Sequence, residues 1–153
     1  MIHWETVKED FQWDGSLRDI CITPATIDDW RIIYPLLTTY AGVEFSVDGM
    51  RHAFPAKVDA IFDLRSTSGP ALQIRAGRIA IVFHFFTPGE IECDFDSREV
   101  SSQADLDALL GFVRQLGKAT QKRVIITPEN LRENPIVSYS VKTDSFKYHE
   151  AVC

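Results

Sequence analysis

The segment EIECDFD places an acidic side chain at every second position, and these are Glu90, Glu92, Asp94 and Asp96. The positions between them hold Ile91, Cys93 and Phe95. Successive side chains of a β-strand point to opposite faces of the sheet. As a strand, the segment would line one face with carboxylates and the other with apolar groups. This alternation is typical of an antiparallel sheet that packs against a core on one side only.

The register of this strand depends on the loop that precedes it. Residues 78–86 also alternate, and residues 87–89 (TPG) connect them to the acidic segment. A two-residue loop would turn the acids toward the core. A three-residue loop, with Gly89 in the left-handed conformation, instead pairs Phe85 with Ile91 and turns the acids outward. Because burial of unpaired carboxylates is costly, we predict the three-residue loop.

This register brings His84 directly across from Glu92 on the outer face, which also carries Phe86. Same-face neighbours on one strand lie ~6.7 Å apart, so two unit charges repel by about 0.6 kcal/mol in water. Water tolerates that repulsion, and a solvated outer face is one interpretation. Because Phe86 and His84 are unusual on a fully wet face, the alternatives are a cover formed by the C-terminal tail or a mixed apolar and acidic recognition surface.

Three turn signals organise the other strands, and they are WDGS (13–16), VDGM (47–50) and RAGR (75–78). Asp-Gly between two apolar runs is a strong hairpin signal. The first turn predicts a hairpin that pairs Phe11 with Arg18 and places Trp13 on its apolar face. The third turn predicts that Ile74 pairs with Ile79.

Helices are predicted between these turns. Thr26 can cap a helix that Pro35 would kink or end early. Residues 55–65 begin with proline and place apolar groups at helical spacing. Residues 102–117 show the clearest buried stripe, with Ser102 and Asp105 resembling a capping box and Gly117 ending the helix. Strands are predicted at 123–127 and 136–141, and 127–134 reads as a single helical turn.

Along the chain, the predicted elements form more hairpins than strand–helix–strand crossovers. The sequence therefore predicts an α+β fold, with a mainly antiparallel sheet built from consecutive hairpins and two or three helices packed on one face. A chain of 153 residues suits one domain, residues 1–153. The tail from about residue 142 carries no decisive pattern.

Composition excludes several functional classes. The net charge of −6 disfavours nucleic-acid binding, which needs a basic surface. No apolar run approaches the ~20 residues that span a bilayer, and the start shows no signal peptide, so no membrane association is expected. Three widely spaced cysteines, Cys21, Cys93 and Cys153, argue against a disulfide framework and favour the cytoplasm. No cofactor-binding motif is present, and no cofactor is expected.

Two functions remain. The first is a small acidic binding protein that recognises a basic protein partner through the outer face, with binding residues Glu90, Glu92, Asp94, Asp96, His84 and Phe86. Antitoxin and immunity proteins are acidic domains of this general sort. The alternative is a small hydrolase that uses His84 oriented by Glu92, or a divalent metal held by Asp94 and Asp96. An exposed strand edge would also allow a homodimer.

Overall fold

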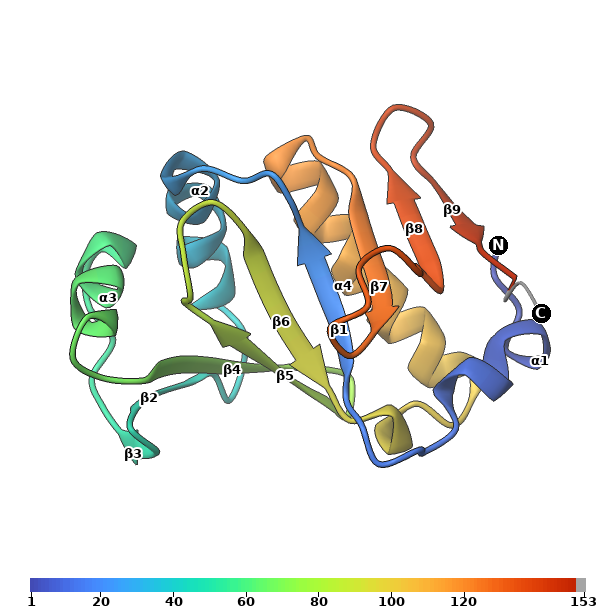
Figure 1. Cartoon of the computed structure of the whole chain (residues 1–153), viewed down its shortest axis with the longest axis horizontal. Coiled ribbons are helices and arrows are strands. Elements are labelled where there is room, and N and C mark those ends of the chain that lie inside the picture. The colour runs from blue at the N-terminus through green and yellow to red at the C-terminus, as the bar shows by residue number, and fades with distance from the viewer. Residues whose placement is uncertain (151–153) are drawn as a thin grey trace.

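Nine strands form one antiparallel sheet in the computed structural model, which describes residues 1–150 (Figure 1). The strand order is β3-β2-β4-β5-β6-β1-β7-β8-β9. The strands are β1 (Arg18–Ile22), β2 (Glu44–Val47), β3 (Met50–Arg51), β4 (Pro70–Ala76), β5 (Ile79–His84), β6 (Ile91–Phe95), β7 (Val124–Pro128), β8 (Val137–Ser140) and β9 (Ser145–Tyr148). The predicted α+β class and antiparallel sheet are confirmed.

The helices are α1 (Trp4–Val7), α2 (Ile27–Leu37), α3 (Val58–Arg65) and α4 (Gln103–Thr120), with short 3₁₀ helices η1 (Lys8–Phe11) and η2 (Ser97–Glu99). Figure 1 shows α2 and α4 side by side behind β6, β1 and β7. Between these helices and the sheet lies the core, where Trp30 of α2 contacts Phe83 and Phe85. No helix within residues 1–150 is long and apolar enough to cross a membrane.

The β5–β6 hairpin has the predicted register. Phe83 pairs with Cys93 and His84 pairs with Glu92. Residues Ile91, Cys93 and Phe95 are all buried in the core. The predicted left-handed Gly89 is wrong, because Gly89 does not adopt a positive φ. Its carbonyl oxygen instead accepts a hydrogen bond from the Ala25 N–H at 2.8 Å, which holds the connection against the chain entering α2.

Two other turns are close to their predictions. The 47–50 turn joins β2 to β3, with Asp48 and Gly49 in the left-handed region that such a two-residue loop requires. The β4–β5 turn is displaced, so that Ile74 pairs with Ile81 rather than with Ile79. A shift of two residues leaves every side chain on its predicted face.

The predicted C-terminal ends of α2 and α4 need correction. The capping box of Thr26 and Asp29 is present, but α2 continues through Pro35 to Leu37. Helix α4 passes Gly117 and ends after Thr120, where Gln121 adopts the left-handed conformation. A Cβ atom at Gly117 would lie 2.5 Å from the Tyr139 ring, so this glycine permits close packing of α4 on β8 rather than ending the helix.

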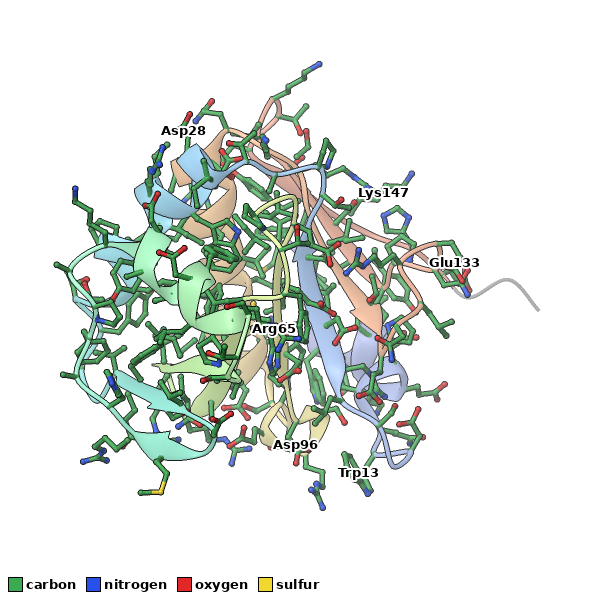
Figure 2. All side chains as sticks on the ribbon, turned by 60° about the vertical axis from the view of Figure 1, so that its left-hand side comes forward. Trp13, Asp28, Arg65, Asp96, Glu133 and Lys147 are labelled. Carbon is green, nitrogen blue, oxygen red and sulfur yellow. The ribbon has the colours of Figure 1, made fainter. Side chains whose placement is uncertain are left out.

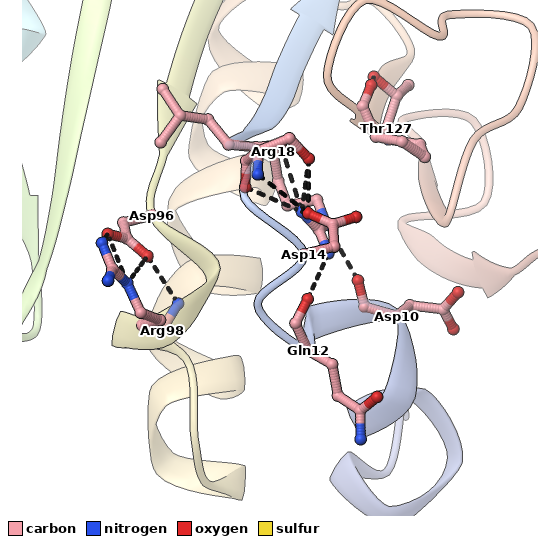
Figure 3. A network of polar contacts seen from close by, with 10 residues as sticks. Asp10, Gln12, Asp14, Arg18, Asp96, Arg98 and Thr127 are labelled. Atoms are coloured by element: carbon pink, nitrogen blue, oxygen red, sulfur yellow. Dashed lines mark hydrogen bonds and ion pairs between the residues drawn. The ribbon is translucent and has the colours of Figure 1, made fainter.

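The hairpin predicted at residues 13–16 is wrong. Residues 4–11 are helical, and β1 lies between β6 and β7. The buried Arg18 guanidinium organises the segment before β1, because it donates to the carbonyl oxygens of Asp10 at 3.0 Å and Gln12 at 2.8 Å (Figure 3). Trp13 is 45 % exposed rather than in the core, and Arg98 stacks on its ring.

The described part of the C-terminal tail, residues 142–150, does not cover the outer face of β5 and β6. Its residues 145–148 form β9, which pairs with β8 at the far edge of the sheet from β3. The helical turn predicted within 127–134 is also absent. Residues 129–134, here called the strap, instead run in front of β1 and β7 as a series of turns (Figure 1). The strap, rather than tail residues 142–150, therefore covers part of the outer face.

Candidate functional site

The outer face of β5, β6 and β1 brings several carboxylates together. Asp94 of β6 lies opposite Val82 of β5 on one side and Asp19 of β1 on the other. Glu92, the next outward position of β6, lies between His84 and Cys21. Sequence reasoning missed Asp19, because the wrong hairpin had assigned β1 a different neighbour. Two carboxylates, Asp19 and Asp94, thus stand directly opposite each other.

His84 is bonded to Asp94 rather than to Glu92. The His84 Nε2 atom lies 2.7 Å from Asp94 Oδ2, diagonally across the two strands. This hydrogen bond raises the pKa of His84, although partial burial opposes the rise. The Phe86 ring stacks on His84, with centroids 5.2 Å apart, and the Arg65 guanidinium lies 5.4 Å from the Phe86 centroid. The predicted His–Glu dyad is therefore a His–Asp pair.

The strap brings a cation onto the acidic row, which is the set of outward carboxylates Glu90, Glu92 and Asp94. The Arg132 guanidinium donates through Nη1 to Glu90, and its Nη2 lies 3.5 Å from Glu92 Oε2. The backbone N–H of Asn130 donates to Asp19 Oδ2 at 2.9 Å. Because the strap lies over β1, Asp19 is only 4 % exposed and Cys21 is fully buried. Arg132 is a site residue that no local pattern in the sequence indicates.

Burial has the largest effect on the pKa of two of these carboxylates, Glu92 and Asp19. It raises the pKa of Glu92, and the negative charge of Asp19 adds to this effect while Arg132 opposes it. The pKa of Asp19 is also raised, again chiefly by burial; the hydrogen bond from the Asn130 N–H opposes the rise, and the negative charge of Asp94 adds to it. The centre of the acidic row is thus a partly desolvated cluster rather than a freely solvated face.

Asp96 is separated from this cluster by its own partner. Arg98 binds both carboxylate oxygens of Asp96 and the Asp96 side chain caps η2. Figure 2 shows Asp96 at the lower end of the molecule, on the same side as Trp13. The two carboxylates predicted to share a metal, Asp94 and Asp96, therefore hold different partners. Within residues 1–150, no group of three His, Cys, Asp or Glu side chains is arranged to hold a metal ion.

Two hollows of the described surface lie away from the His84–Asp94 pair. One of about 240 Å³ lies on the outer face over β2, β4 and β5, where Ala71, Gln73 and Val82 line it. Another, of about 560 Å³, lies between α2 and α3. Neither includes His84 or Asp94 in its lining. The His–Asp pair is therefore outside both hollows, and its nearest link to them is Val82, which lines the smaller hollow and lies opposite Asp94.

We expect Asp19→Asn to stabilise the protein near neutral pH by up to about 1 kcal/mol, because it removes one of two like charges placed directly opposite. The amide oxygen can still accept the Asn130 N–H. A folded-state pKa above that of the unfolded chain makes the native state bind its proton more tightly, so wild-type stability falls as pH rises through that pKa. The advantage of the variant should therefore shrink as pH is lowered into the range where native Asp19 is protonated.

Urea unfolding across this pH range measures the difference. The exposed Asp63→Asn is the matched control, because its side chain is outside the cluster and should show no comparable gain. A loss of stability in Asp19→Asn at neutral pH would contradict the assignment of Asp19 as a destabilising buried charge.

Comparison with protein-family models, with curated proteins and with solved structures finds no match to this chain. The function must therefore be argued from the site alone.

Proposed function

We propose that the protein is a small acidic cytoplasmic binding protein, of the antitoxin or immunity type, that recognises a basic protein partner through the outer face of β5, β6 and β1. The observation that carries the proposal is the convergence of Glu92, Asp94 and Asp19 on one sheet face, with Glu90 beside them through the arginine that it shares with Glu92. An exposed aromatic ring, Phe86, lies beside them. Acidic groups next to an exposed aromatic side chain suit a partner that carries arginine or lysine.

The net charge of −6 favours the same class of partner, since it speeds the approach of a basic protein and repels nucleic acid. The cytoplasmic assignment rests on Cys21 and Cys93, which are buried free thiols. Cys153 lies outside the described residues. Pairing of two copies through β3 or β9, the edge strands, is the homodimer that this sheet would allow.

Affinity capture from the source cell, followed by a variant test, examines the proposal. We expect a captured basic partner to bind the double variant Glu90→Gln/Glu92→Gln at least tenfold more weakly, because both substitutions remove charge from the centre of the face. The control is Asp63→Asn/Asp107→Asn, which changes net charge equally at exposed positions of α3 and α4. A partner whose affinity falls equally with both double variants, or with neither, would contradict recognition through this face.

The alternative proposal is a small hydrolase, and the 2.7 Å contact between His84 and Asp94 favours it. A carboxylate that orients an imidazole is a common arrangement for a general base. Hydrolysis of a panel of ester and phosphoester substrates that disappears in His84→Asn would support this function. Activity that persists in that variant would rule out His84 as the base.

A further inference from the structure

We infer that the outer face contains a guanidinium-binding site in which the chain's own Arg132 occupies the place of a partner's arginine, so that the strap competes with the partner. This inference rests on the proposed function and deepens it, since it names the partner's contacting group and the regulation of the site.

The first support is the fit of a guanidinium to the two carboxylates. One terminal nitrogen of Arg132 bonds Glu90 and the other lies beside Glu92, at the next outward position of the same chain segment. A planar guanidinium can address two carboxylates at once through its fork, whereas an ammonium acts as a single point charge. The side chain of Arg132 is 36 % exposed, so the bound group lies at the surface and not in the core. The site is therefore selective for arginine and reachable from solvent.

The second support is the weak attachment of the strap. Between Pro128 and Ile136 the side chains of Glu129, Leu131 and Glu133 are exposed, so lifting the strap uncovers little apolar surface of its own. Its tertiary polar contacts are those of Asn130 with Asp19 and of Arg132 with the glutamates. Beyond it, the Ile136 N–H donates to the Ile126 carbonyl oxygen at 2.7 Å and anchors the chain. The strap can leave while β7 and β8 stay paired.

The third support is the charge left behind. If Arg132 departs, Glu90 and Glu92 lose their cation, and Asp19 loses the N–H that it accepts beneath the strap. Partly buried carboxylates without a counter-charge are unfavourable, so the open state demands another cation. A partner's arginine supplies it. The apparent affinity of the partner is then reduced by the fraction of molecules in which Arg132 holds the site.

The test uses the full chain and two fluorescent probe peptides of equal length and charge, one arginine-rich and one lysine-rich. Wild type should bind the arginine peptide more tightly, and Glu90→Gln/Glu92→Gln should weaken it about tenfold and abolish the preference. The variant Arg132→Gln should bind the arginine peptide about five- to tenfold more tightly than wild type. Its control is Arg75→Gln, the same charge change at an exposed position of β4.

The sign of the Arg132 effect decides the inference. If Arg132→Gln binds no more tightly than Arg75→Gln while the glutamine double variant still weakens binding, the strap is no competitor, and the inference fails while the proposed function stands. If the double variant binds as tightly as Asp63→Asn/Asp107→Asn, both fail. Equal affinity for the two peptides overturns the guanidinium site. Should Arg132→Gln not fold, Arg132→Lys keeps the charge without the fork and should also bind more tightly than wild type.

Discussion

Substitution of Phe95 by alanine is expected to destabilise the protein by about 3–5 kcal/mol, the range for a buried aromatic side chain. Phe95 is 2 % exposed on the inner face of β6, and its ring stacks on Phe11 with centroids 6.2 Å apart. Its removal loses the transfer free energy of the ring and leaves a cavity between the sheet and the N-terminal segment. Denaturant unfolding measures the loss.

The matched control is Phe86→Ala. Phe86 follows β5 in the same hairpin, but its ring is 51 % exposed on the outer face. We expect a cost below about 1 kcal/mol, since the half-exposed ring packs against His84 and Arg65 at the surface rather than in the core. Reversal of the two values would show that the inner and outer faces had been exchanged, and the acidic site would lose its geometric basis.

Arg18→Met should cost about 3 kcal/mol, because it leaves several carbonyl oxygens without their donor. The Arg18 side chain is 5 % exposed and donates to the carbonyl oxygens of Asp10, Gln12 and Ser16 and to the Asp14 carboxylate (Figure 3). These bonds hold residues 12–17, the irregular segment between η1 and β1, which no regular hydrogen-bond ladder supports. Thermal and denaturant unfolding both report the loss.

Arg75→Met is the control for Arg18, since Arg75 is exposed on β4 and should change stability by less than about 0.5 kcal/mol. Arg18→Lys should fall between the two, because an ammonium has three donors and cannot reach all of the acceptors. Equal stability of Arg18→Met and wild type would contradict the structural role assigned to this guanidinium.

Short-range patterns predicted those elements whose cause is local. The alternation of residues 91–95 identified both faces of β6. A strand that buries Ile91, Cys93 and Phe95 must turn the side chains between them to the opposite face. The box of Thr26 and Asp29 marked the start of α2, because both hydrogen bonds are made within four residues.

The N-terminal segment was predicted wrongly for a physical reason. Val7 and Phe11 are four residues apart, and that spacing places them on one face of a strand and also on one face of a helix. The Asp14-Gly15 pair then favoured a hairpin. What decides the structure is the long-range pairing of β1 with β6 and β7, together with the Arg18 guanidinium, which donates to carbonyl oxygens six and eight residues before it.

In the candidate site, too, the residues placed by local contacts could be predicted and those placed by long-range contacts could not. Glu90, Glu92, Asp94 and His84 could be placed on one face from the sequence, because two neighbouring strands and a short loop position them. Asp19 and Arg132 could not, since they reach the face through a strand order and a strap that depend on contacts about 40 to 110 residues away in the chain. Asp19 adds a buried carboxylate to the acidic face and Arg132 adds a counter-charge, so the interpretation changes from a solvated acidic row to a partly desolvated cluster.

The most direct test of the account is nuclear magnetic resonance mapping of the partner's footprint on the labelled protein. Recognition through the outer face predicts that titration shifts signals of His84, Glu92, Asp94 and the strap, while signals of α2 and α3 stay in place. Shifts confined to α2, α3 or the β3 edge, with His84 and the strap unchanged, would contradict it.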